Sequence, residues 1–192
     1  MNTRSFLFLT ILIKYYCTII KSEGPCPTLS LISYNPKKYP KLPETKGFLA
    51  GKYFDNSTIY VGTGNSDVCK HQPNTPGRIS TSTIGKGAGS YIECSGEHFD
   101  DKTPAYLANH PNLRWVKADI TILSSLTGAV AIKSGDFGFF IGRINLTASN
   151  GMIYQQVSKL HVDNGAQGLW YINEDGSTAS TDNGYEVLVC TI

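Results

Sequence analysis

The sequence predicts an all-β protein with two tandem, pseudo-symmetric antiparallel β repeats of about 80 residues that form one compact domain. Three observations support this prediction. Short apolar or aromatic runs alternate with turn signals, and no stretch after residue 24 keeps helical periodicity for three turns. In addition, features of one half of the chain recur in the other half at a common offset. The length of 192 residues is sufficient for a hydrophobic core.

Residues 1–24 are typical of a secretory signal peptide. A basic start is followed by an apolar run over residues 5–13, and Ser22 and Gly24 form a small-x-small cleavage pattern. Lys14 interrupts the apolar run, so no window reaches the roughly 20 apolar residues that a membrane helix needs. We therefore expect a secreted, extracellular protein without a membrane span. The alternative is an uncleaved signal anchor with the domain outside.

The net charge supports no argument about an anionic partner. The chain has 17 basic and 15 acidic residues, which gives a formal charge of +2. Removal of residues 1–24 takes away Arg4, Lys14, Lys21 and Glu23, so 14 residues of each sign remain and the net charge becomes zero. The sequence therefore does not resemble a dedicated nucleic-acid binder.

The cysteines are consistent with export. Cys17 lies in the predicted signal peptide, which leaves Cys26, Cys69, Cys94 and Cys190, an even number for an oxidising compartment. We expect two disulfides, with all three pairings open, and the alternative is four buried free thiols. The cysteines form no C-x-x-C pair and no histidine stands at ligand spacing from them, so the sequence predicts no metal site.

Two N-x-[ST] sequons predict N-glycosylation at Asn56 and Asn145. If they are glycosylated, both asparagines must lie on exposed turns or strand edges.

The sequence divides into five segments. After the signal peptide, residues 25–46 form an arm rich in proline and lysine. Residues 47–110 form the first β repeat, residues 111–125 a connecting strand, and residues 126–192 the second β repeat. Strands are predicted where apolar or aromatic residues cluster, at residues 58–61, 91–94, 113–118, 139–144, 169–172 and 185–190. Glycine-containing turn signals separate them, at residues 85–89, 163–165, 174–176 and 182–184.

The repeat prediction depends on a shared offset of about 80 residues. Residues 59–62 align with residues 139–142, and residues 90–92 align with residues 170–172. Residues 76–79 align with residues 157–160 at an offset of 81. Any one of these matches could arise by chance, but their common offset indicates a duplicated unit.

The sequence lacks the motifs of common enzyme classes. It has no Gly-x-Ser-x-Gly elbow, no phosphate loop and no His-Glu-x-x-His motif. A strand, not a helix, is predicted after the glycine-rich residues 85–89, which does not favour a phosphate cradle. Glu97 and His98 have no nucleophile motif beside them, so we expect a structural hydrogen-bonding role there. We therefore expect a protein that is not an enzyme and needs no cofactor.

The order of motifs resembles the DM-nine repeat family of invertebrate proteins, which includes mannose-binding lectins. The resemblance covers nearly all of residues 47–190. In the first unit and its exit, the matching residues are Tyr60-Val61-Gly62, Pro76-Gly77-Arg78, Tyr91-Ile92, Gly96-Glu97-His98 and Leu113-Arg114-Trp115-Val116. In the second unit they are Phe140-Ile141-Gly142-Arg143, Lys159, Tyr171-Ile172 and Tyr185-Glu186-Val187-Leu188-Val189.

The resemblance implies one sugar site in each repeat, formed by an acidic and a basic residue. A carboxylate accepts hydrogen bonds from two adjacent sugar hydroxyls, and a cation donates to neighbouring oxygens. The basic residues carried over are Arg78 and Lys159. The family's acidic position, seven residues before the strand aromatic, is occupied by Tyr53 and Lys133, so the nearest acids, Asp55 and Asp136, are the candidates.

These observations lead to two hypotheses for function. The first is a secreted lectin that binds mannose-like glycans on microbial or cell surfaces, where self-association of chains would add avidity. The alternative is a non-catalytic secreted interaction or structural protein with the same fold and a degenerate sugar site.

Overall fold

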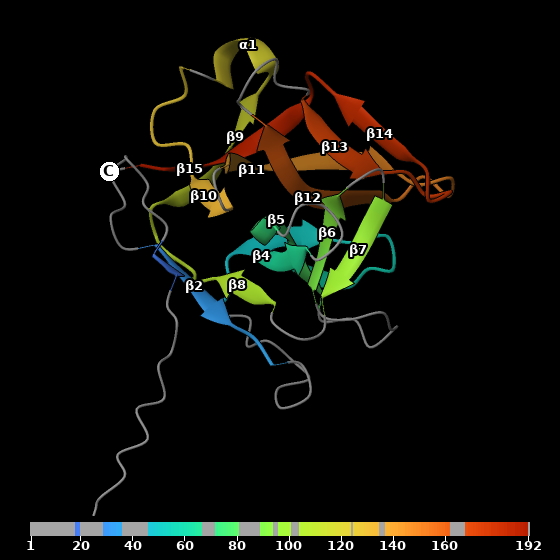
Figure 1. Ribbon diagram of the computed structural model, residues 1–192. Coiled ribbons are helices and arrows are strands. Elements are labelled where there is room, and N and C mark those ends of the chain that lie inside the picture. The colour runs from blue at the N-terminus through green and yellow to red at the C-terminus, as the bar shows by residue number, and fades with distance from the viewer. Residues whose placement is uncertain are drawn as a thin grey trace, which may run out of the picture.

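The structure is a computed structural model that describes residues 18–19, 29–35, 46–66, 72–80, 89–93, 96–100, 104–123, 125–134, 137–161 and 168–191. In these residues nearly all regular structure is β, arranged as two separate antiparallel sheets (Figure 1). The one helix of these residues, α1 (Ile120–Leu123), is a single turn whose amide groups at Thr121 and Ile122 donate to Asp119 Oδ1.

The first sheet has the strand order β1-β2-β8-β4-β5-β6-β7, and β3 also pairs with β4. Its strands are β1 (Thr18–Ile19), β2 (Ser30–Ser33), β3 (Leu49–Lys52), β4 (Thr58–Ser66), β5 (Gln72–Ser80), β6 (Gly89–Glu93), β7 (Gly96–Asp100) and β8 (Ala105–Leu107). The second sheet has the order β14-β13-β12-β11-β15-β9, and β10 also pairs with β11. Its strands are β9 (Leu113–Ala118), β10 (Ala131–Ser134), β11 (Phe137–Thr147), β12 (Ile153–His161), β13 (Leu169–Ile172), β14 (Thr178–Thr181) and β15 (Tyr185–Cys190).

The two sheets repeat the same topology, which confirms the predicted fold class. The order β2-β8-β4-β5-β6-β7 in the first sheet corresponds to β9-β15-β11-β12-β13-β14 in the second, and the short strands β3 and β10 each pair with the long strand of their sheet. The registers also agree, because Gly62 pairs with Tyr106 as Gly142 pairs with Val187. The chain is thus two copies of one β unit.

Two strands that lie outside the predicted repeats belong to the two units. Residues 30–33, within the predicted arm, form β2, which pairs with β8. The predicted connecting strand, β9, pairs with β15 and is the edge strand of the second sheet. Both strands therefore hold equivalent places, each at the start of one unit.

A shared core lies between the sheets. Fully buried side chains from the first sheet, such as Ile59, Val61 and Leu107, join one cluster with Ile141 and Leu188 from the second. Each sheet also carries a smaller hydrophobic cluster on its other face. Tyr34, Tyr60, Ile79 and Tyr106 form a small cluster on the first sheet, and a cluster around Leu160, Tyr185 and Val187 lies on the second.

Candidate functional site

The two basic residues that are predicted to bind sugar occupy equivalent positions. Arg78 on β5 pairs with Val61, and Lys159 on β12 pairs with Ile141, the residue that corresponds to Val61. Both residues are buried, with only 6% of Arg78 and 5% of Lys159 exposed. The repeat register is therefore as predicted, but neither cation lies on an open surface.

The Arg78 guanidinium has partners inside the protein. Arg78 Nη2 lies 2.6 Å from Glu97 Oε1, and the Ser90 hydroxyl donates a hydrogen bond to the same carboxylate oxygen. The guanidinium carbon lies 3.7 Å from the centre of the Tyr53 ring. Arg78 Nε is buried and has no hydrogen-bond partner among the described residues. This arrangement balances the Arg78 charge, so the predicted structural role of Glu97 agrees with its contacts.

Tyr53 stands where the family pattern has an aspartate, and it contacts Arg78 through its ring. Burial raises the pKa of Tyr53 to about 12, and the nearby Arg78 opposes this rise in pKa. Asp55, the acidic candidate of this unit, lies in the exposed turn between β3 and β4. There Asp55 Oδ1 accepts a hydrogen bond from the Ser57 amide at 2.9 Å. The carboxylate that pairs with Arg78 is thus Glu97, which is not among the predicted sugar ligands.

In the second unit, Lys159 Nζ lies 5.0 Å from the centre of the Phe139 ring. Its predicted acidic partner, Asp136, lies outside the described residues. His98, beside Glu97, stacks on Tyr91 with ring centres 5.7 Å apart.

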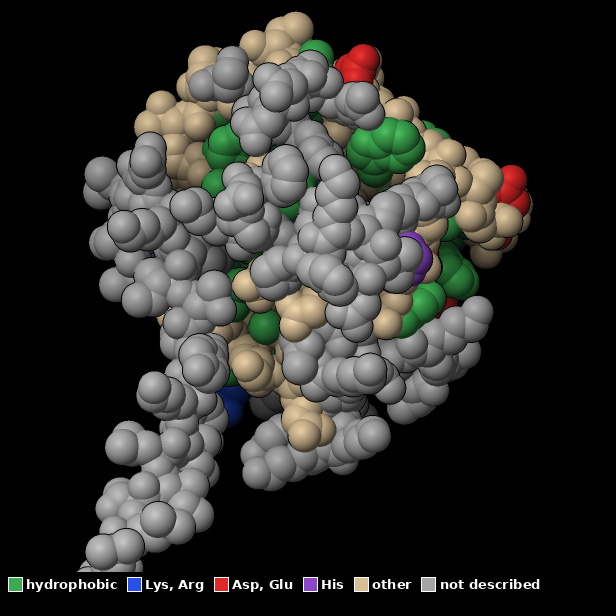
Figure 2. Space-filling view, in the orientation of Figure 1, with side chains coloured by type: hydrophobic (Ala, Val, Ile, Leu, Met, Phe, Trp, Pro, Cys, Tyr) green, Lys and Arg blue, Asp and Glu red, His purple; other side chains and the backbone are tan. Residues whose placement is uncertain are grey.

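A surface hollow of about 460 Å³ lies where the turn after β13 meets the tip of the β11–β12 hairpin. Carboxylate, amide and hydroxyl side chains line it, together with an aromatic residue and a leucine. The lining residues are Leu146, Thr147, Tyr154, Asn173, Glu174 and Asp175. We call this site the β13–β14 hollow. At the right-hand margin of the molecule in Figure 2, acidic side chains lie among tan atoms, and hydrophobic side chains lie below them.

The carboxylates of the hollow are positioned by local hydrogen bonds. The Ser149 amide donates to Glu174 Oε2 at 2.7 Å, and the Ser149 hydroxyl donates to Oε1 at 3.1 Å. The amide and hydroxyl of Ser177 both donate to Asp175 Oδ1, which lowers the pKa of the Asp175 carboxyl. Gly176, with a φ of 85°, allows the tight turn that presents both acids. Each carboxylate can still accept further hydrogen bonds.

Aromatic rings connect this hollow to the first sheet. Tyr154 on β12 packs edge-on against Phe54, with ring centres 6.2 Å apart, and against Tyr53 at 6.1 Å. Phe54 is 47% exposed, whereas Tyr154 is buried. Burial, and then the Glu174 charge, raise the pKa of Tyr154, so its hydroxyl keeps its proton at neutral pH. The hollow therefore combines hydrogen-bond acceptors with nearby apolar ring surface.

From the sequence, residues 174–176 are predicted only as a turn. Its acids become part of a hollow because Tyr154, 20 residues away in the chain, lies beside them. No pattern in the sequence connects these two segments.

Both asparagines of the predicted glycosylation sites are exposed. Asn56 is exposed in a turn with a φ of 62°, and Asn145 is exposed on β11, where its Oδ1 accepts from Gln155 Nε2. Cys190 is fully buried and is disulfide-bonded. Cys26, Cys69 and Cys94 lie outside the described residues, so the two-disulfide framework stays a prediction.

Within the described residues, no group of three or more histidine, cysteine, aspartate or glutamate side chains could hold a metal ion. No helix of that part of the chain is long and apolar enough to cross a membrane. Comparison with protein-family models and with curated proteins finds no match to this chain. The resemblance to the DM-nine family therefore depends on the ordered motifs alone.

Proposed function

We propose that this protein is a secreted, non-catalytic recognition protein that binds carbohydrate, and that the β13–β14 hollow is its binding site. The observation that carries the proposal is the convergence of Glu174, Asp175 and Asn173 in one hollow, next to the exposed Phe54 ring that packs against Tyr154. Carboxylate and amide oxygens accept hydrogen bonds from vicinal sugar hydroxyls, and aromatic surface covers the C–H face of a sugar ring.

The hollow supports the proposal better than the two basic positions do. A sugar hydroxyl must reach its protein partner, and Arg78 and Lys159 are almost completely buried. Glu174 and Asp175 are exposed, and their carboxylates are already oriented by Ser149 and Ser177. Such prior orientation reduces the entropy lost on binding. Mannose-like glycans of microbial or cell surfaces are the ligand class that we propose, on the resemblance alone.

A glycan array and a mannan-agarose column test the proposal. The wild-type protein is expected to bind, and Glu174→Gln is expected to weaken binding by about tenfold or more, because a hydrogen bond to a charged acceptor is lost. Asp182→Asn is the matched control, because it neutralises an exposed acid in the turn after β14, outside the hollow. Equal binding by wild type and Glu174→Gln would contradict the assignment to the hollow.

A second candidate is a non-catalytic interaction protein whose original sugar site is degenerate. The burial of Arg78 and its ion pair with Glu97 favour this candidate, because this cation has an internal partner. If the folded protein binds no glycan on the array, this second candidate replaces the first.

A further inference from the structure

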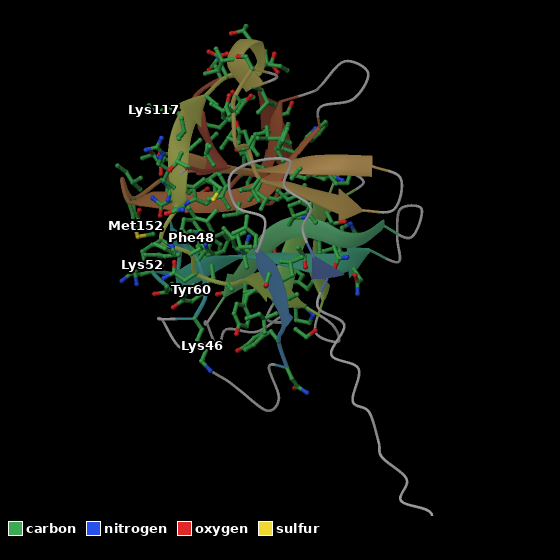
Figure 3. The ribbon with its side chains drawn as sticks, turned by 90° about the vertical axis from the view of Figure 1, so that its left-hand side faces the viewer. Lys46, Phe48, Lys52, Tyr60, Lys117 and Met152 are labelled. Atoms are coloured by element: carbon green, nitrogen blue, oxygen red, sulfur yellow. The ribbon has the colours of Figure 1, made fainter. Side chains whose placement is uncertain are left out.

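Three exposed lysines lie on one side of the molecule. Lys117 on β9, Lys52 on β3 and Lys46 just before β3 are all exposed. Figure 3 shows Lys117, Met152, Lys52 and Lys46 following one another down this side. We call it the lysine side. Because the chain without its predicted signal peptide has no net charge, this clustering is a local feature of the surface.

Strand pairing and one hydrogen bond make the lysine side continuous across both sheets. Lys117 pairs with Glu186, and Glu186 pairs with Arg143 across β9, β15 and β11. Arg143 Nη1 then donates to the Ala50 carbonyl of β3 at 2.8 Å, two residues before Lys52. Neighbouring strands lie about 4.8 Å apart, so Lys117 and Arg143 are roughly 10 Å apart at their Cα atoms. Lys117 and Lys52 therefore lie on one continuous side of the molecule, with the Arg143–Glu186 ion pair between them.

Two acidic residues beside these lysines, Glu186 and Asp55, accept hydrogen bonds from Arg143 and from Ser57. Arg143 forms a 2.6 Å ion pair with Glu186, so these two charges balance each other. Lys52 Nζ donates to the neutral Thr58 hydroxyl at 2.8 Å. Asp55, three residues after Lys52, accepts a hydrogen bond from the Ser57 amide within its own turn.

Large aliphatic side chains are exposed beside Lys52. Leu49 on β3 is 54% exposed, and Ile153 at the start of β12 is 63% exposed. Ile153 is near Lys52 because Gln155, two residues further along β12, accepts a hydrogen bond from the Lys52 amide at 2.7 Å. The half-buried Met152 precedes Ile153. Exposed apolar residues rimmed by charged ones mark an interaction surface.

We propose that the lysine side binds the surface of a bilayer that contains anionic phospholipids. Lysines there would contact the negative headgroups, while Leu49 and Ile153 would enter the boundary between headgroups and acyl chains. A sulfated polysaccharide or a nucleic acid would use the lysines but would leave the aliphatic residues in water. The combination of the two residue types therefore favours a lipid surface. Binding here is peripheral and uses other residues than the carbohydrate site does.

Vesicle co-sedimentation tests this proposal. The purified protein is expected to sediment with vesicles of equal parts phosphatidylcholine and phosphatidylserine and not with pure phosphatidylcholine. Each lysine near an anionic surface strengthens partitioning roughly fivefold, so the triple variant Lys46→Gln, Lys52→Gln and Lys117→Gln is expected to lose about 100-fold. Added salt is expected to weaken wild-type binding. Leu49→Ser with Ile153→Ser is expected to reduce binding at low salt as well.

Arg114→Gln provides the matched control. Arg114 is exposed on the same strand as Lys117 but points to the opposite face of the sheet, because side chains alternate along a strand. Its loss is expected to leave vesicle binding unchanged, and thermal unfolding verifies that every variant is folded. Sedimentation with both vesicle types alike, with neither, or retention on heparin without vesicle binding would each overturn the proposal. Glu174→Gln is expected to keep full vesicle binding, which separates this test from that of the carbohydrate site.

Discussion

The Arg78 guanidinium is a buried cation whose charge is balanced inside the protein. Glu97 supplies the opposite charge at 2.6 Å, and the Tyr53 ring covers the guanidinium. The Arg78 side chain is 7% exposed and the Glu97 side chain 17% exposed. In such surroundings an ion pair contributes little net stability, but loss of one partner leaves an uncompensated charge. Arg78 therefore has a structural role in the folded protein.

The first prediction concerns this pair. Glu97→Gln is expected to lower the free energy of unfolding by about 3 kcal/mol, because the Arg78 charge stays buried without a counter-charge. The double variant Arg78→Met with Glu97→Gln is expected to be more stable than Glu97→Gln alone. Urea unfolding measures both values. Additive losses in the double variant would show that the two side chains do not act as a pair.

A second prediction concerns alkaline pH. Burial raises the pKa of both Tyr53 and Tyr185 to about 12, whereas a tyrosine in the unfolded chain loses its proton near pH 10. The folded state therefore holds these protons more tightly than the unfolded state does. The free energy of unfolding is expected to be steady below about pH 10 and to fall as the pH rises towards about 12.

The variant Tyr185→Phe tests whether Tyr185 causes this fall in the free energy of unfolding. The Tyr185 hydroxyl is buried and has no hydrogen-bond partner among the described residues, so its removal is expected to cost nothing at neutral pH. The variant is expected to lose less stability than wild type between about pH 10 and 12. Urea unfolding at several pH values gives the comparison. An unchanged slope would show that Tyr185 does not contribute to the pH dependence.

At the scale of elements, the two units differ in how β5 meets β6 and how β12 meets β13. In the first sheet Gly77 on β5 pairs with Tyr91 on β6, so close that a Cβ on Gly77 would collide with the Ser90 carbonyl. In the second sheet Ser158 occupies the corresponding place, and β12 and β13 share a single paired position, Leu160 with Leu169. There the Gln156 amide bonds to the backbone of Ile172 instead.

The third prediction follows from this close approach. Gly77→Ala is expected to destabilise the protein by about 1–3 kcal/mol, because the obstructing atoms belong to the backbone of β6 and cannot move independently. Gly138→Ala on β11 is the control. A Cβ on Gly138 meets nothing within 4 Å, so this variant is expected to be neutral or more stable by up to about 1 kcal/mol. Thermal unfolding of both variants checks the difference, and equal losses would contradict it.

At the scale of the whole molecule, the two sheets share one core. Leu107 and Val61 from the first sheet are in the same cluster as Ile141 and Leu188 from the second. The contacts between the two halves therefore form part of the hydrophobic core of each half. Neither sheet can lose its partner without exposing apolar surface, so we expect both to unfold in one cooperative step.

The fourth prediction uses the two tryptophans as reporters. Trp115 and Trp170 both lie in the second sheet, on β9 and β13. Leu107→Ala in the first sheet is expected to remove about 2–5 kcal/mol and to lower the urea midpoint of tryptophan fluorescence as much as that of circular dichroism. A fluorescence midpoint that stays at the wild-type value would show that the halves unfold independently.

The sequence alone was sufficient for the fold class and the duplication. Alternation and turn residues are local properties, so the β character of both units could be read directly. The offset of 81 residues correctly paired Arg78 with Lys159, because a duplicated chain keeps the order of its strands. The sequence could not show that the predicted arm contributes β2, since its short run has no clear alternation.

Only the tertiary structure decided which side chains meet. Arg78 meets Glu97, not Asp55, because β5, β6 and β7 lie side by side in one sheet. Tyr154 and Glu174 share a hollow because two separate hairpins end at the same place. The lysine side exists because β9 and β3, from different sheets, are joined through Arg143. A strand's sequence encodes which of its faces is apolar, whereas the packing of whole sheets determines which faces and edges come together.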